Sequence, residues 1–103
     1  MTFVLDFHPL VQTDLAEAAD WYARVAPEQA ERFLNVAQAR MRELMSNAPL
    51  YRPRLDDIRR LNFDIFPHAI FYFIAENVVV ILGVLHGMRD TDSELRRRRA
   101  GYE

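Results

Sequence analysis

Two adjacent apolar segments constrain the fold of this chain more than any other feature. Residues 69–75 (AIFYFIA) and 78–85 (VVVILGVL) carry no charged side chain and are rich in aromatic and branched residues. Only Glu76-Asn77 separates them, which predicts the two-residue turn of a β-hairpin, where asparagine tolerates a positive φ. Because neither segment alternates polar and apolar side chains, we expect both strands to be central in a sheet and covered on both faces.

The first half of the chain predicts one strand followed by a helical hairpin. Residues 3–7 form a short apolar stretch that ends before His8-Pro9, which is typical of a strand. Apolar side chains then recur at helical spacing up to Val25, and again from Pro27 until residues 46–49. Two amphipathic helices joined by so short a break predict an antiparallel pair.

The second half predicts the rest of a sheet and a short final helix. Residues 50–57 are polar and predict a connecting loop, whereas residues 58–64 alternate as a half-buried strand does. In the tail, residues 91–103, the spacing of Thr91 and Glu94 matches a capping box and predicts a short helix that frays at its end. The expected order is β-α-α-β-β-β(-α). We therefore expect residues 1–103 to form a single α+β domain, in which a mainly antiparallel sheet packs against a helical hairpin.

The composition excludes several kinds of chemistry. The sequence has no cysteine, which excludes disulfide scaffolds, zinc ribbons and cysteine nucleophiles. All 13 basic residues are arginine, so lysine-based catalysis is excluded as well. The three histidines lack close metal-ligand spacing and there is no phosphate loop, so we expect no metal and no cofactor. No signal peptide opens the chain, and no apolar run reaches the roughly 20 residues of a membrane-spanning helix, which predicts a cytoplasmic protein.

Charge is distributed unevenly along the chain. The net charge of -2 does not indicate a nucleic-acid binder as a whole. Residues 1–50 carry 4 arginines and 7 acidic residues, whereas residues 51–103 carry 9 arginines and 8 acidic residues. Any basic surface must therefore come from the second half. Within it, the run Arg96–Arg99 could bind nucleic acid or the acidic side chains of a partner, and the plain alternative is a solvated, frayed tail.

The most informative candidate site follows the second apolar segment, where a buried strand reaches the surface. His86, Arg89 and Asp90 lie together there. Further arginines of the preceding loop and strand could converge on them: Arg52, Arg54, Arg59 and Arg60. Arginine clamps phosphate and histidine moves a proton near neutral pH, which would suit RNA cleavage by attack of a 2′-hydroxyl on the neighbouring phosphate. The structural alternative is that His86 caps the strand end and an Arg89–Asp90 pair anchors the tail.

The remaining candidates are one tryptophan and two histidines. We expect Tyr22 in the core, and Trp21 in contact with another strand or with a partner. His8 is expected to begin the first helix, and His68 to lie half-exposed at the start of a strand.

Taken in order and spacing, these features resemble the ParE/RelE superfamily, the toxins of type II toxin–antitoxin modules, across essentially the whole chain. The segments that carry the resemblance are His8-Pro9, Asp14-Leu15-x-Glu17-Ala18-x-x-Trp21-Tyr22, Ala30-x-Arg32-Phe33, Arg59-Arg60-Leu61, Phe66-Pro67-x-x-Ile70-x-Tyr72 and His86-Gly87-x-Arg89-Asp90. The last of them looks more like the ParE branch, whose members poison DNA gyrase. The resemblance therefore implies a bacterial, growth-inhibiting gyrase toxin that is not an enzyme.

Two alternatives stay open within the same superfamily. RelE-like members cleave messenger RNA on the ribosome, although this sequence has no lysine where those toxins often place catalytic lysines. In that case His86, Arg89 and Arg60 would be the catalytic residues of an endoribonuclease. A non-enzymatic or decayed toxin that acts only as a binding module is the other alternative.

The resemblance also implies a partner. Superfamily antitoxins fold a C-terminal segment onto the toxin, so we expect a hetero-oligomer with a cognate antitoxin, which an apolar patch or an open strand edge would favour. The residues expected to meet the antitoxin or the target are Trp21 and the basic residues of the loop, strands and tail: Arg52, Arg54, Arg59, Arg60, Arg89, Arg96, Arg97 and Arg98.

Overall fold

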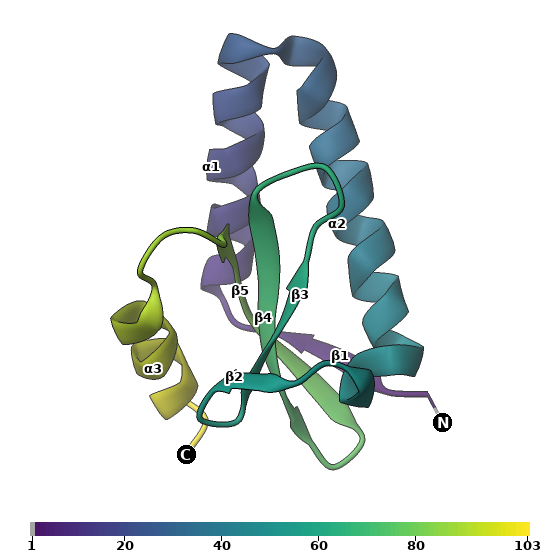
Figure 1. The fold of residues 1–103 in the computed structure, drawn as a ribbon, viewed down its shortest axis with the longest axis vertical. Helices are drawn as coiled ribbons and strands as arrows, with labels where there is room; N and C mark the ends of the chain where they lie inside the picture. Colours follow the sequence, from purple (N-terminus) through teal and green to yellow (C-terminus); the bar gives the residue numbers. More distant parts are fainter. Residues whose placement is uncertain (1) are drawn as a thin grey trace.

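The computed structural model describes residues 2–103 and folds them into a five-stranded sheet with three α-helices (Figure 1). In chain order the elements are β1 (Val4–Phe7), α1 (Leu10–Val25), α2 (Pro27–Asn47), the 3₁₀ helix η1 (Ala48–Leu50), β2 (Pro53–Leu55), β3 (Ile58–Asn62), β4 (His68–Ala75), β5 (Val78–His86) and α3 (Asp92–Ala100). The strand order is β1-β5-β4-β3-β2, and only β1 and β5 pair in parallel. The predicted α+β class, the mainly antiparallel sheet and the helical hairpin are confirmed.

Two details of the sheet differ from the sequence-based prediction. Residues 53–55, expected in a loop, form β2 and pair with β3 at the edge of the sheet. An edge strand tolerates proline and arginine, because one side of it faces solvent and needs no ladder partner. The turn between β4 and β5 has its positive φ, 56°, at Glu76 and not at Asn77.

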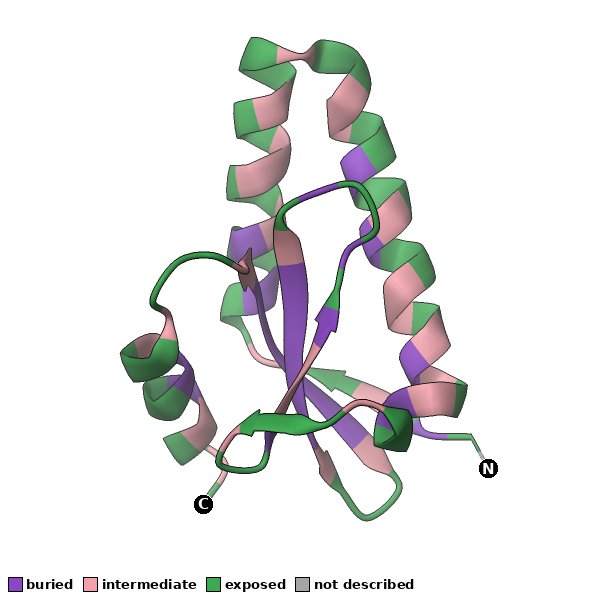
Figure 2. Cartoon of the chain, in the orientation of Figure 1, coloured by how far each residue is buried: buried purple, intermediate pink, exposed green. Residues whose placement is uncertain are grey.

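One face of the sheet is covered by the helical hairpin of α1 and α2. Its core brings Phe33 and Leu44 of α2 against Tyr72 and Ile81 of the central strands. The hydroxyl of Tyr72 donates a 2.7 Å hydrogen bond to the carbonyl oxygen of Ala48, so this buried polar group is satisfied. Figure 2 shows the buried residues along the central strands, at intervals along α2 and in the first turns of α1.

The tail covers the second face, as the continuous apolar sequence of β4 and β5 requires. Phe71, Phe73 and Leu82 pack there with Leu95 of α3, whose side chain is 1% exposed. The predicted final helix is confirmed, whereas a solvated, frayed tail, considered for the run Arg96–Arg99, is wrong for Arg98, which is buried. The tail instead provides the apolar cover that β4 and β5 need on their second face, and the sequence did not predict this role.

A buried ion pair ties α3 to α1 beside β5. Arg98 Nη1 lies 2.7 Å from Asp14 Oδ2, and the two side chains are 7% and 6% exposed. The pair also serves the backbone of β5 beyond the end of β1: Arg98 donates to the Leu82 carbonyl at 3.0 Å, and Asp14 accepts from the Val84 N–H at 3.0 Å. Gly83 leaves room for this, because a Cβ there would stand 2.7 Å from Arg98 Nη1. Side chains thus replace the strand neighbour that β5 lacks at this point.

Candidate functional site

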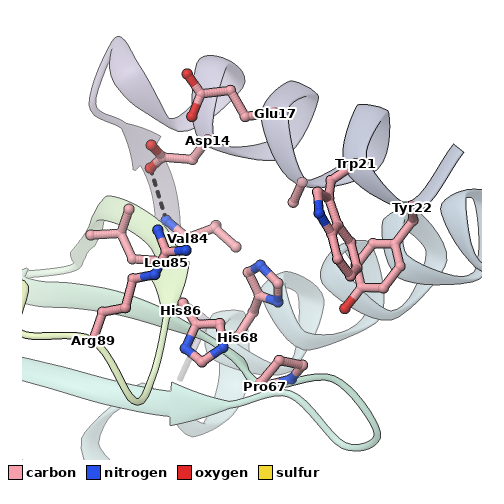
Figure 3. Close-up of a pocket in the computed structure, with 11 residues that line it drawn as sticks. Asp14, Glu17, Trp21, Tyr22, Pro67, His68, Val84, Leu85, His86 and Arg89 are labelled. Carbon is pink, nitrogen blue, oxygen red and sulfur yellow. Dashed lines mark hydrogen bonds between the residues drawn. The ribbon is translucent and has the colours of Figure 1, made fainter. Parts of the chain in front are cut away.

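Two hollows lie on either side of the turn that follows β5. The large hollow, about 430 Å³, lies between α1 and the adjoining ends of β4 and β5 (Figure 3). Its main polar and aromatic lining residues are Asp14, Glu17, Trp21, Tyr22, His68, His86 and Arg89. The second, which we call the arginine hollow, measures about 180 Å³ and is lined by Arg54, Arg60, Phe71, Gly87, Arg89 and Leu95, among others. Arg89 lines both hollows.

Two histidines face each other across β4 and β5 in the large hollow. His68 lies opposite His86 in the strand register, and the ring centroids are 5.7 Å apart. A register shift makes Leu82 an extra residue in β5, and without this β-bulge His68 would lie opposite Leu85. His86 Nδ1 accepts a 3.1 Å hydrogen bond from the Met88 N–H, which supports the strand-capping role considered for it.

The environment of His68 keeps its ring neutral near pH 7. Burial, and to a smaller extent the nearby His86 and Arg89, lowers the pKa of His68 to about 4. Its Nδ1 is buried and has no hydrogen-bond partner among residues 2–103, and the ring packs edge-on against Phe33 at a centroid distance of 4.8 Å. His68 is therefore part of the hollow's wall rather than a proton carrier at neutral pH.

Three of the predicted arginines do converge. Arg54, Arg60 and Arg89 come from β2, β3 and the turn after β5, and all line the arginine hollow. Burial and the positive charge of Arg54 lower the pKa of Arg60, which reflects the closeness of like charges there. The convergence of loop, strand and strand-end arginines expected from the sequence is thus present for these three.

The comparison with known proteins decides the family. Residues 5–91 match the family model described as the ParE toxin of the type II toxin–antitoxin system parDE. The chain belongs to the ParE toxin family. It is similar to Toxin ParE2 of Mycobacterium tuberculosis strains CDC 1551 / Oshkosh and H37Rv, with 30% identity over 94 residues, 90% of each chain.

A solved structure shares the fold of this toxin. The structure described as the chromosomal ParDE TA system from P. aeruginosa aligns with a TM-score of 0.75 at 19% identity, over 82% of this chain and 96% of that chain. The family match ends at residue 91, so α3 of the toxin lies beyond it. Within residues 2–103 no helix is long and apolar enough to cross a membrane.

The other arginines of the toxin's loop and strands do not join the arginine hollow. Arg59 donates to the carbonyl oxygens of Pro49 and Tyr51, and so anchors the segment that leads into β2. Arg52 is exposed and lines neither hollow. Adjacent residues of a strand point to opposite faces, which explains why Arg59 and its neighbour Arg60 have different surroundings.

Each of the four tail arginines has a carboxylate partner within the toxin. Arg96 pairs with Asp56 at 3.4 Å and Arg97 with Glu94, and both arginines stay exposed. Arg98 is buried against Asp14, which leaves its guanidinium no free surface for a partner. Arg99 pairs with Asp57 at 2.9 Å, and its guanidinium carbon lies 3.9 Å from the ring centroid of Phe73. Arg98 and Arg99 therefore hold the tail against the rest of the domain, whereas Arg96 and Arg97 lie at the surface.

Trp21 remains a candidate contact residue. Its side chain is 51% exposed on α1 beside the large hollow, where it packs edge-on against Tyr22 at 5.0 Å. Tyr22 in turn packs against Phe33 and Phe66, as expected of a core residue.

The Arg89–Asp90 ion pair considered above is not among those formed by residues 2–103, where Asp90 instead accepts from the Asp92 N–H.

Sequence reasoning missed three polar residues of the large hollow. Asp14 and Glu17 of α1 were noted only as parts of a motif, and His68 only as a strand-start residue. A regular hairpin centred on residues 76 and 77 predicts His68 opposite Leu85, one residue from His86, and only the β-bulge at Leu82 makes the two histidines a direct pair. Within the described part of the chain, no group of three or more histidine, cysteine, aspartate or glutamate residues could hold a metal ion.

The pKa of His68 gives a testable dependence of stability on pH. The pKa is lower in the folded chain, about 4, than the 6.5 of an ordinary histidine, so the unfolded chain binds more protons between these values. The stabilising contribution is complete above pH 6.5 and is lost as the pH falls toward 4. Allowing for solvent screening, we expect the free energy of unfolding to fall by about 1–2 kcal/mol more in the wild type than in His68→Gln over this pH range, because glutamine cannot titrate. Urea unfolding of both proteins at several pH values measures this, and a constant difference would contradict it.

Proposed function

We propose that this toxin inhibits DNA gyrase and is neutralised by a cognate antitoxin, with which it forms a hetero-oligomer in the bacterial cytoplasm. The observation that carries the proposal is the ParE family match over residues 5–91. The contact residues proposed for the antitoxin or the target are Trp21, Arg52, Arg54, Arg60, Arg89, Arg96 and Arg97. Arg59 and Arg98 are left out, because both side chains are engaged within the chain.

The distribution of polar residues favours inhibition over catalysis. An endoribonuclease needs its proton carrier and its anion-binding arginines at the same phosphate. Here His86 lines the large hollow and Arg60 the arginine hollow, on either side of the turn that carries Gly87. A RelE-like endoribonuclease remains the second candidate function, because Arg89 lines both hollows and could serve a phosphate from either.

An unpaired strand edge and several exposed apolar side chains support the antitoxin part of the proposal. β1 lies at the edge of the sheet, with one side unpaired. Large apolar side chains are exposed on β1 and on the helical hairpin: Val4, Phe7, Leu10, Trp21, Val25 and Leu34. A partner segment could add to this edge or cover these side chains, as amphipathic segments do at unpaired strands and apolar grooves.

Expression in the host without the neighbouring gene, which we expect to encode the antitoxin, tests both candidates. We expect growth to stop and gyrase–DNA breaks to accumulate, and co-expression of the neighbouring gene product to restore growth. His86→Ala should leave growth arrest unchanged if gyrase is the target. Codon-specific new transcript ends that disappear in His86→Ala and Arg89→Ala would instead establish the endoribonuclease. Normal growth together with tight binding of the neighbouring product would favour a decayed toxin.

A further inference from the structure

The arginine hollow holds three cations for which the chain provides almost no counter-charge. Among residues 2–103, the carboxylates that form ion pairs with arginine serve Arg40 and the four tail arginines, and none of them pairs with Arg54, Arg60 or Arg89. Only Asp92 contributes a carboxylate to the lining. The lining of the hollow therefore carries a net positive charge, with three arginines and one aspartate.

Arg60 is held in place at the centre of this group. Its Nε donates a 2.6 Å hydrogen bond to Asn62 Oδ1, and its guanidinium carbon lies 5.7 Å from the ring centroid of Phe71. A Cβ on Gly87 would overlap Arg60 Nη2, so the guanidinium lies in space that a side chain at residue 87 would fill. The Gly87 N–H donates to the Pro67 carbonyl at 2.7 Å, which fixes the turn. The terminal nitrogens of Arg60 make no hydrogen bond within the described residues, so they can serve a ligand.

The ligand that fits is an oxyanion with acceptors in several directions. A carboxylate is planar and is satisfied by one bidentate guanidinium. A phosphate group presents tetrahedrally arranged oxygens, which three guanidiniums from three different segments can reach.

We propose that the arginine hollow binds the phosphodiester backbone of a nucleic-acid strand through Arg54, Arg60 and Arg89. This goes beyond gyrase inhibition, and it rests on the proposed function only in expecting DNA, the substrate that gyrase holds, rather than RNA. Because the whole chain is net negative, we expect weak binding. Because the contacts are between arginine and phosphate, we expect the binding to weaken as the salt concentration rises.

Fluorescence anisotropy of a short labelled DNA duplex, titrated with the purified toxin at several salt concentrations and without gyrase, tests the proposal. We expect Arg54→Ala, Arg60→Ala and Arg89→Ala each to weaken binding roughly threefold to tenfold and to reduce the salt slope by about one. Arg32→Ala and Arg42→Ala remove exposed arginines of α2 that form no ion pair, and they should leave binding unchanged. Arg54, exposed on β2, keeps the test valid if the Arg60 variant unfolds.

The outcomes separate this proposal from the proposed function. Loss of binding confined to the hollow variants supports it, even if the toxin leaves gyrase active. Single-stranded RNA bound in place of the duplex, with the same three variants affected, supports the phosphodiester site and favours the endoribonuclease. The proposal is overturned if neither nucleic acid binds at low salt, if a polyglutamate peptide binds in their place, or if the α2 controls weaken binding equally.

Discussion

Asp14→Ala should destabilise the toxin by about 3 kcal/mol, because it leaves the Arg98 guanidinium buried without its main counter-charge. The Val84 N–H loses its acceptor at the same time. Glu94, 2.7 Å from Arg98 Nε, keeps part of the compensation, which places the loss at the lower end of the range for broken buried pairs. Since small proteins unfold at a cost of about 5–15 kcal/mol, the loss is a large fraction of the total free energy of unfolding.

Urea unfolding of the wild type and four variants measures this effect. Asp20→Ala, at an exposed position of the same helix, is the matched control and should change the free energy of unfolding by less than about 0.5 kcal/mol. Arg98→Ala should also destabilise, and the double variant should lose less than the two single losses combined, with a coupling of more than about 1 kcal/mol. Additive losses, or a loss below about 1 kcal/mol in Asp14→Ala, would show that the pair does not hold α3 to α1.

Phe33→Ala should destabilise the toxin by about 3–5 kcal/mol. The side chain is fully buried and joins the helical hairpin to the sheet, with ring contacts to Tyr22, Phe63, Phe66 and His68 at centroid distances between 4.8 and 5.5 Å. Removing the ring leaves a cavity among side chains from α1, α2 and the β3–β4 connection, which cannot all collapse into it.

The adjacent residue provides the control for Phe33. Leu34→Ala removes a similar apolar side chain, but one that is 43% exposed, and should cost less than about 1 kcal/mol. Thermal or urea unfolding of both variants compares them directly. Equal losses at the two positions would mean that the hairpin does not pack on the sheet through this face of α2.

The sequence contained enough to predict the main elements, because their signals are local. Helical spacing of apolar residues predicted α1 and α2, and the two apolar segments around Glu76-Asn77 predicted the central hairpin. β2 gave no such signal, since Pro53 and Arg54 are residues typical of loops. A strand tolerates them here only because it lies at the edge of the sheet. The positive φ of Glu76 could not be predicted either, because asparagine is the residue that usually adopts it.

The sequence predicted where the candidate site lies but not that it consists of two separate hollows. Basic residues around His86 pointed to the end of β5, where both hollows lie. The separation of Arg60 from His86 depends on the packing of the turn at Gly87, and the His68–His86 pairing depends on a β-bulge, neither of which has a sequence signal here. Arg98 is the clearest limit: its counter-charge, Asp14, lies 84 positions away, so nothing near the arginine run marks it as buried.

A DNA supercoiling assay with purified gyrase tests most directly whether the toxin inhibits gyrase and is neutralised by an antitoxin. Excess toxin should abolish supercoiling and leave gyrase covalently attached to broken DNA, and pre-incubation with the neighbouring gene product should restore full activity. Unchanged supercoiling at toxin concentrations that arrest growth in cells would contradict the claim, and would show that this ParE-family fold acts on another target.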